Sequence, residues 1–224
     1  MCGRYAIFPP FAGLERRLGL GLDLPPRYNV APGQTVPIVR AGGDGYALAD
    51  AHWGLIPFWA RERKIGYSTF NARVETVAEK PAFRAAFRHR RCLIPAGGFY
   101  EWQDLGAGRR KQPWFIADAG GDGLAFAGLW ERWRDPDSGE TVDSCSILVG
   151  PADPALLPIH ARLACIVPPE HYRDWLAPDA PPPFLFALLA PYPAARLRTW
   201  RVSAAVGNVR NDGPELVAPR PEPH

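Results

Sequence analysis

RCLIPAGGFYEW (91–102) carries the clearest structural signal in the chain. Its first half is apolar, a pair of glycines interrupts it, and two aromatic side chains flank the single acidic residue, Glu101. Apolar or aromatic runs of this length that are interrupted by glycine are typical of β-strands. The stretch therefore predicts a strand, a turn and a second strand.

Similar runs lie on both sides of this stretch, with short turns such as GGDG and RDPDSGE between them. Strands are expected over 35–40, 46–55, 113–120, 123–133, 144–152 and 196–203, and helices over 11–20, from Pro81 onward and over 169–176. Because strands outnumber helices and most connections are short, we predict antiparallel pairing. The expected fold class is α+β, a mainly antiparallel β-barrel or sandwich with a few flanking helices.

The expected domain organisation is one domain over 1–217. The segment PELVAPRPEPH, which closes the chain, is expected to fray, with 218–224 disordered. The sequence shows no βαβ alternation and no glycine-rich phosphate loop, which argues against a doubly wound nucleotide-binding fold. The apolar fraction of 47% and the charged fraction of 22% are ordinary for a globular protein of 224 residues.

Location and redox state follow from other features of the sequence. The first residues do not resemble a signal peptide, and the most apolar stretch (181–193) is too short to span a membrane. We therefore expect a cytoplasmic protein with no membrane contact. The cysteines, Cys2, Cys92, Cys145 and Cys165, contain no CxxC pair, so neither a disulfide nor a metal site is expected, and no cofactor is implied. The last three lie in apolar runs and are expected to be buried, inert thiols.

Cys2 is different because of its position. Cells remove Met1 when the next side chain is small, and the mature chain then begins with a cysteine that carries a free α-amine beside its thiol. The reference pKa is about 8.5 for the thiol and about 7.7–8.0 for the amine. Each group therefore has a usable nucleophilic fraction near neutral pH.

The net charge is only +3, but basic residues concentrate in RERK (61–64) and in the run KPAFRAAFRHRR (80–91). Such runs form either an anion or nucleic-acid surface or a solvated helix face. Both interpretations stay open from the sequence.

Four polar stretches stand out against apolar surroundings: MCGRY, STFNARVET (68–76), GGFYEW (97–102) and PIHARL (158–163). Together they supply a nucleophile, an amide, a carboxylate and an imidazole, which are Cys2, Asn71, Glu101 and His160. If these groups meet in space, they make an acid–base site.

Each candidate has a structural alternative. On an alternating strand Glu101 would point outward, His160 would be a core histidine, and Asn71 would cap a turn. Arg73 and Glu75 would form a surface ion pair of little value. In HWGLIPFWA, the aromatic residues Trp53, Phe58 and Trp59 would be either core or a surface on which unpaired bases stack.

Taken in order, the stretches resemble the SRAP family, the SOS response-associated peptidases now regarded as abasic-site processing proteins. The segments that carry the resemblance span almost the whole chain: MCGRY, RYNVAPG (27–33), HWGLIPFW (52–59), FNARVET (70–76), RCLIPAGGFYEW, KQPWFI (111–116), IHAR (159–162) and VSAAVGNVRNDGPELV (202–217). One segment alone would be weak evidence, but the ordered set is highly specific.

The resemblance implies an enzyme that crosslinks itself to DNA. Once Met1 is lost, Cys2 attacks the ring-opened aldehyde of an abasic site in single-stranded DNA, and its amine and thiol close a thiazolidine on one carbon. Asn71 would orient the α-amine, Glu101 would shuttle protons during formation and slow reversal, and His160 would assist opening of the sugar ring.

The resemblance also implies the DNA-binding residues. Arg4, Arg73 and Arg162 would hold phosphates, the last two bidentately. Asn29 and Pro32 would shape the groove, and Phe58 and Trp59 would form a wedge beside the lesion. The partner would be single-stranded DNA containing abasic sites, bound by a monomer that associates with the nucleoid on DNA.

This chain departs from the family pattern at a few positions. Leu163 and Ala164 replace a common Met-Pro after the histidine, Gly97 replaces a common Asp, and Val149 replaces a common Thr. None of these departures removes a reactive group. Two functions compete with crosslinking: an amidohydrolase or peptidase with an N-terminal cysteine nucleophile, and a nucleic-acid-binding module without covalent chemistry.

Overall fold

The computed structural model describes residues 2–43, 45–106 and 108–220. The strands are β1 (Tyr5–Ile7), β2 (Arg27–Val30), β3 (Thr35–Gly42), β4 (Gly45–Trp53), β5 (Asn71–Arg73), β6 (Arg91–Ala96), β7 (Gly98–Gln103), β8 (Gln112–Asp118), β9 (Leu124–Arg134), β10 (Thr141–Pro151), β11 (Arg162–Ala164) and β12 (Leu197–Arg201). The α-helices are α1 (Ala12–Leu18), α2 (Arg84–His89), α3 (Tyr172–Leu176) and α4 (Pro182–Leu188). Short 3-10 helices are η1 (Arg63–Ser68), η2 (Pro154–Leu156), η3 (Pro169–His171), η4 (Ala194–Arg196), η5 (Ala204–Gly207) and η6 (Pro214–Leu216).

Five strands close into a barrel in the order β10, β4, β3, β6 and β9, because β9 pairs with both β6 and β10. All of these pairings are antiparallel except the one between β4 and β10. Two short strands, β5 and β11, extend the sheet from β10. The predicted α+β class with a mainly antiparallel barrel is therefore confirmed.

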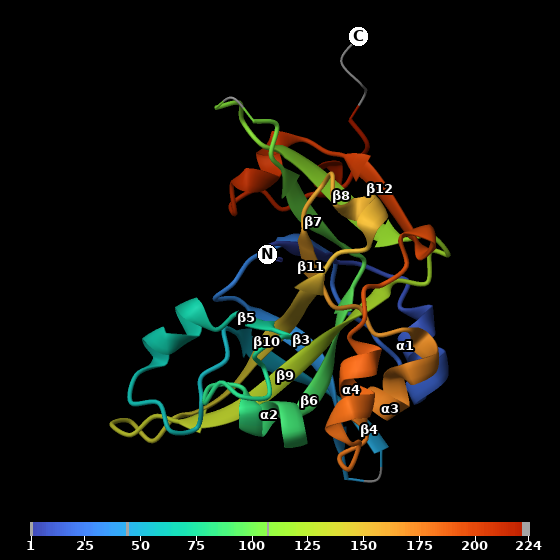
Figure 1. Cartoon of the computed structure of the whole chain (residues 1–224). Coiled ribbons are helices and arrows are strands. Elements are labelled where there is room, and N and C mark those ends of the chain that lie inside the picture. Colours follow the sequence, from blue (N-terminus) through green and yellow to red (C-terminus); the bar gives the residue numbers. More distant parts are fainter. Residues whose placement is uncertain (1, 44, 107, 221–224) are drawn as a thin grey trace.

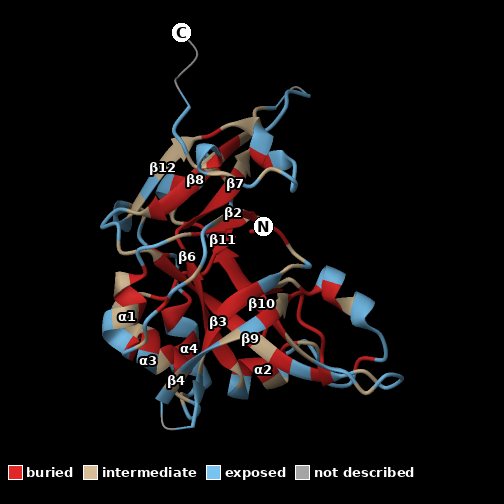
Figure 2. Cartoon of the chain, turned by 180° about the vertical axis from the view of Figure 1, so that it is seen from behind, coloured by how far each residue is buried: buried red, intermediate tan, exposed pale blue. Residues whose placement is uncertain are grey.

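A second sheet follows the order β12, β8, β7, β1 and β2, and lies beside the barrel. Figure 1 shows β7, β8 and β12 on one side of the barrel strands, with α1, α3 and α4 grouped together at its flank. Strands β6, β9 and β10 of the barrel are largely buried, whereas exposed residues gather on β4, on the outer faces of the helices and in the loops (Figure 2).

The stretch 91–102 connects the two sheets. It forms β6 and β7 as predicted, but the two strands do not make a hairpin, since β6 pairs inside the barrel and β7 pairs with β1 and β8. The glycines explain the crossing. A Cβ on Gly97 would lie 2.7 Å from the Phe8 ring, and one on Gly98 would lie 2.4 Å from the Phe115 ring. Only residues without side chains let the aromatic rings approach the backbone this closely.

The predicted helix at Pro81 begins later than expected. Residues before it form turns, in which the backbone N–H of Lys80 donates to Thr76, and α2 starts at Arg84. Phe83 and Phe87 are nevertheless both buried, as the i, i+4 spacing predicted. The basic run that contains this helix is partly structural, because the guanidinium of the buried Arg91 donates to the carbonyls of Phe87 and Trp175.

The segment after Gly213 does not fray where the structure describes it, contrary to expectation. Leu216 is buried within η6, the Val217 carbonyl accepts the Trp200 indole N–H, and the Arg220 N–H donates to Arg201. The remainder of the predicted tail, residues 221–224, lies outside the described residues. No described helix has the length and apolar character needed to cross a membrane.

Candidate active site around Cys2

The chain around Cys2 is held at the junction of the two sheets. The Tyr100 N–H donates to the carbonyl of Arg4, and Tyr5 pairs with Phe99, so the first residues run antiparallel to β7. This pairing brings Cys2 near Glu101. Burial raises the pKa of the Cys2 thiol well above its ordinary value, and the charge of Glu101 raises it further. The thiol therefore stays protonated at neutral pH, which corrects the expectation of a usable nucleophilic fraction at the sulfur.

Asn71 lies at the start of β5, which pairs in parallel with β10 and fixes the residue opposite Ile147. Its amide nitrogen donates to the Cys2 carbonyl at 2.7 Å. Its amide oxygen is buried and accepts no hydrogen bond from the residues that the structure describes. A buried acceptor without a partner is costly, so the oxygen is ready to take an N–H at this end of the chain.

Glu101 lies in β7 and is only 2% exposed, so the structure excludes the alternative of an outward-facing strand residue. Burial raises its pKa to about 7. A carboxyl group with a pKa near neutral can both donate and accept a proton at physiological pH. This is the property that a proton shuttle requires.

His160 precedes β11 and has a half-buried side chain. Burial lowers the pKa of its imidazole, which is therefore neutral near pH 7. Its Nδ1 lies 2.6 Å from the Arg162 carbonyl oxygen and 3.1 Å from the Arg162 amide nitrogen, contacts that fix the ring. Nδ1 is 3.9 Å from Oε2 of Glu101, a separation that a single intervening oxygen atom can bridge.

Arg162 and Arg73 lie on opposite sides of β10, because Val149 pairs with Arg73 in β5 and with Ala164 in β11. Arg73 is exposed. Arg162 forms a two-bond ion pair with Glu75, with distances of 2.8 and 2.7 Å. The structural alternative considered from the sequence was an ion pair between Glu75 and Arg73. The structure instead pairs Glu75 with Arg162.

Arg4 and Asn29 form part of a network that pins the segment 206–211. The guanidinium of Arg4 donates to the Asn29 side-chain oxygen and to the Val206 carbonyl, both at 2.9 Å. The Asn29 amide donates to the carbonyls of Val206, Asn208 and Asn211. Because Asn29 is only 3% exposed, its side chain serves to hold the backbone of the segment 206–211 in place. Pro32 is half-buried in the turn between β2 and β3.

The aromatic residues of HWGLIPFWA divide into two groups. Trp53 is fully buried in the core, and its indole N–H donates to Phe70. Phe58 and Trp59 are 61% and 49% exposed. Only the last two are therefore available to stack on a base.

Two features of this region were not expected from the sequence. The Val149 carbonyl, at the position of the Thr-to-Val departure, accepts from Arg162 at 3.1 Å. Tyr67, in η1, is 78% exposed and lies in the same segment as the basic run 61–64. Tyr67 could have been recognised as a candidate nucleic-acid contact, because it is an aromatic residue close to a basic run. The role of the Val149 carbonyl could not, because every residue has a backbone carbonyl.

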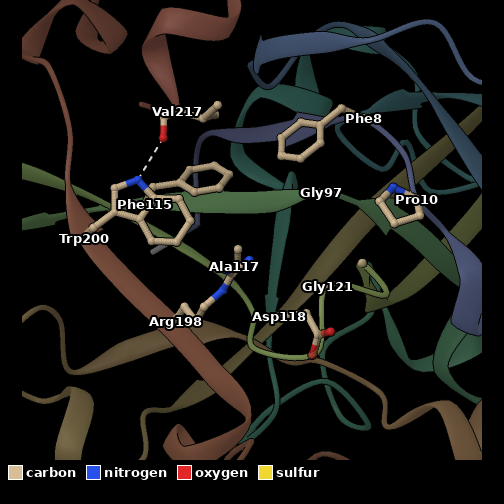
Figure 3. A pocket seen from close by; sticks show the side chains of 11 residues that line it. Phe8, Pro10, Gly97, Phe115, Ala117, Asp118, Gly121, Arg198, Trp200 and Val217 are labelled. Carbon is tan, nitrogen blue, oxygen red and sulfur yellow. Dashed lines mark hydrogen bonds between the residues drawn. The ribbon is translucent and has the colours of Figure 1, made fainter. Parts of the chain in front are cut away.

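A cavity of about 270 Å³ lies at the other end of β7 (Figure 3). Rings of Phe8, Phe115 and Trp200 line it, and Asp118 and Arg198 lie at its polar side. Gly97, one of the departures from the family pattern, also lines this cavity. That departure therefore lies just before β7, four positions before Glu101 in the chain.

The prediction that Cys92, Cys145 and Cys165 are buried thiols is confirmed. Cys92, Cys145 and Cys165 are free and buried, and burial raises the pKa of Cys165 to about 12. Among the described residues, no group of three or more His, Cys, Asp or Glu side chains has the arrangement of a metal site.

The fold and the site together define a class of protein: a β-barrel with an appended sheet, in which the cysteine at position 2 lies beside a carboxyl group and a neutral imidazole. A family model described as SOS response associated peptidase (SRAP) matches residues 1–209, and the chain belongs to this family.

Similar proteins cover almost the entire chain. Abasic site processing protein YoqW of Bacillus subtilis is 38% identical, over 97% of this chain and 99% of that protein. Abasic site processing protein YedK of Escherichia coli is 31% identical, over 98% of this chain and 100% of that protein. A solved structure from Bacteroides thetaiotaomicron has a TM-score of 0.85 at 26% identity and covers 98% of this chain and 100% of that one.

Proposed function

We propose that this protein processes abasic sites in single-stranded DNA by bonding its N-terminal cysteine covalently to the lesion. The relatives named as abasic site processing proteins support this proposal. The observation that carries it is the meeting of four groups from separate segments: Asn71 binds the Cys2 backbone, Glu101 acts electrostatically on the Cys2 thiol, and His160 lies 3.9 Å from Glu101.

The reaction begins with loss of Met1, a residue outside those that the structure describes. The freed α-amine of Cys2 adds to the aldehyde carbon of the ring-opened abasic sugar and forms a carbinolamine. Water leaves to give an imine, and the Cys2 thiol then adds to the same carbon. The amine gives up both of its N–H protons to the departing water, and the thiol proton returns one proton to the nitrogen, so the balance is aldehyde plus aminothiol giving thiazolidine plus one water.

Glu101 and Asn71 have distinct tasks in this sequence. The side-chain oxygen of Asn71 accepts an N–H of the amine and points its lone pair at the aldehyde. Glu101, with a pKa of about 7, protonates the departing hydroxyl as water and takes the thiol proton as the carbon–sulfur bond forms. Concerted proton removal matters because burial keeps the thiol protonated.

His160 would act on the sugar rather than on the cysteine. Its neutral imidazole can exchange a proton with the ring oxygen or the hydroxyl at C1′, which opens the closed form of the sugar to the aldehyde. His160 Nδ1 lies 3.9 Å from Glu101 Oε2, so an oxygen that contacts both groups would sit beside the line that joins them.

The other predicted residues would bind DNA. Arg4, Arg73 and Arg162 would contact phosphates, and Phe58 with Trp59 would stack beside the lesion. Asn29 and Pro32 would shape the groove, Asn29 through its hydrogen bonds to the segment 206–211. We propose that the protein acts as a monomer and joins the nucleoid when it is bound to DNA.

The test is denaturing gel electrophoresis of protein mixed with single-stranded DNA that carries one uracil, with and without uracil-DNA glycosylase. A shifted band is expected only after glycosylase treatment, together with a protein mass that lacks one methionine. The band should disappear in Cys2→Ala and persist in Cys92→Ala, in which a buried internal thiol is removed instead.

A variant with one extra residue before Cys2 keeps the thiol but lacks the adjacent amine. It should bind DNA and form no stable crosslink. A full crosslink in this variant or in Cys2→Ser would contradict the thiazolidine mechanism. If no crosslink forms and the protein instead cleaves an amide in the absence of DNA, the function is that of an N-terminal cysteine amidohydrolase, which Glu101 and His160 would serve equally well.

A further inference from the structure

Glu75 lies in the turns between β5 and α2, just beyond the strand that carries Asn71 and Arg73. Its carboxylate reaches Arg162, which is 87 positions later in the chain, and binds both terminal nitrogens of the guanidinium. The hydrogen bond from Arg162 holds the pKa of Glu75 below its ordinary value, so the carboxylate is charged at neutral pH.

The guanidinium of Arg162 has no free edge for a second anion. The edge formed by Nη1 and Nη2 is taken by Glu75, and Nη2 also donates to the Val149 carbonyl at 3.1 Å. The remaining nitrogen, Nε, is buried and has no hydrogen-bond partner within the described part of the chain. A phosphate that is to bind Arg162 through two parallel hydrogen bonds must therefore take the place of the carboxylate.

Glu75 is placed so that it can leave. Its side chain is 47% exposed, whereas that of Arg162 is 25% exposed and is also tied to the Val149 backbone. The carboxylate can rotate into water while the guanidinium stays where it is. Arg73, whose positive charge also acts on Glu75, is exposed next to the departing group.

We propose that Glu75 is an exchangeable latch: it occupies the phosphate-binding edge of Arg162 in the DNA-free protein and is displaced by a DNA phosphate. This inference rests on the proposed function. The latch keeps Arg162 ordered in the DNA-free protein, so the Arg162 backbone continues to hold His160. It lowers the affinity for DNA that places a phosphate at Arg162, because the carboxylate must first be displaced. Glu75 thus sets how tightly the protein binds such DNA.

The test uses fluorescence anisotropy with a labelled single-stranded oligonucleotide that carries a tetrahydrofuran abasic analogue, which cannot form the crosslink. Glu75→Gln removes the charge but keeps the shape, so it should tighten binding several-fold at low salt. Glu79→Gln is the matched control, because Glu79 is an exposed glutamate in the same run of turns and belongs to none of the ion pairs found among the described residues. It should tighten binding much less.

A double-mutant cycle separates the latch from a general charge effect. In an Arg162→Gln background, Glu75→Gln should have no larger effect than Glu79→Gln. If the Glu75–Arg162 pair only stabilised the fold, its loss would weaken DNA binding or leave it unchanged. Tighter binding therefore distinguishes the latch from a purely structural ion pair. Melting curves of all variants verify that they are folded.

The outcomes distinguish the latch from the function on which it rests. If wild-type protein binds the oligonucleotide and Glu75→Gln binds no more tightly than Glu79→Gln, the latch is wrong and the proposed function stands. If neither wild-type protein nor Glu75→Gln binds single-stranded DNA, both are wrong. If tightening persists undiminished without Arg162, the carboxylate acts by general repulsion and the latch is again wrong.

Discussion

At the scale of single residues, burial decides what each polar group of the site can do. Glu101 is 2% exposed and has a pKa of about 7, whereas Glu75 is partly exposed, bound to an arginine and has a lowered pKa. Two carboxyl groups near one site therefore carry different charges at pH 7. The first can move protons, and the second can only serve as an anion.

Glu101→Gln should slow crosslink formation by about 100-fold, the usual contribution of one acid–base group. The wild-type rate should change with pH around 7, where Glu101 titrates, and the variant should lose this inflection. The measurement is the rate of crosslink formation in quenched samples between pH 5.5 and 8.5. An unchanged pH profile in the variant would show that another group moves the protons.

The same substitution should also change how stability depends on pH. Because the pKa of Glu101 is higher in the folded protein than in the unfolded chain, the folded state binds more protons between about pH 4.5 and 7. The free energy of unfolding therefore falls as pH rises through this window, by up to about 3 kcal/mol from this group. Relative to the wild type, Glu101→Gln should be more stable at pH 8 than at pH 5 in urea denaturation.

At the scale of elements, local pattern predicted the strands well and the connections less well. Strands β3, β4, β8, β9 and β10 match the expected ranges, because their apolar runs are bounded by glycine, proline or aspartate turns. The three-residue strands β5 and β11 were missed, since their pairing depends on β10 and not on their own propensity. The crossing at Gly97 was misread as a turn, because the Phe8 and Phe115 rings that require it come from distant segments.

The segment after β4 also shows what local sequence cannot decide. Trp53, Phe58 and Trp59 lie within seven positions and look alike in the sequence. Trp53 ends a barrel strand and is buried, whereas Phe58 and Trp59 lie in the loop that follows and are exposed. The burial of each ring depends on where the strand ends, and that is set by pairing with β3 and β10.

Replacing both Phe58 and Trp59 by alanine should weaken DNA binding while leaving the fold intact. Each stacked base is worth about 1–3 kcal/mol, and the exposed rings contribute little packing. Trp53→Ala is the contrasting variant and should cost about 3–5 kcal/mol of stability, because it empties a core site. Anisotropy titration and urea denaturation measure the two effects, and a double variant that binds DNA like the wild type would exclude the wedge.

At the scale of the whole molecule, the site is a product of long-range assembly. The types of its reactive groups were predictable, since each stands out in its own segment. Their partners were not, because the contact between Asn71 and Cys2 and the contact between Glu75 and Arg162 join segments that are 69 and 87 positions apart. The closed barrel supplies these contacts by fixing β5 and β11 beside the same strand, β10.

The C-terminal segment tests how far the domain extends. Leu216 is 1% exposed against the second sheet, and the Val217 carbonyl accepts the Trp200 indole at 2.8 Å. A chain that ends at Gly213 would lose the buried leucine and this acceptor, a loss of about 3–5 kcal/mol in total. A chain that ends at Val217 keeps both and loses mainly the Arg220 hydrogen bond to Arg201, which is worth about 1 kcal/mol.

Urea denaturation of the two truncated proteins should therefore show a large loss of stability for the shorter one and a small loss for the longer one. Both should crosslink abasic DNA at low temperature if they remain folded, because Leu216 and Val217 pack with Ala6, Tyr100 and Trp200 in a cluster that does not include Cys2. If ending the chain at Val217 costs as much as ending it at Gly213, the last described residues are an integral part of the second sheet and the domain extends beyond residue 217.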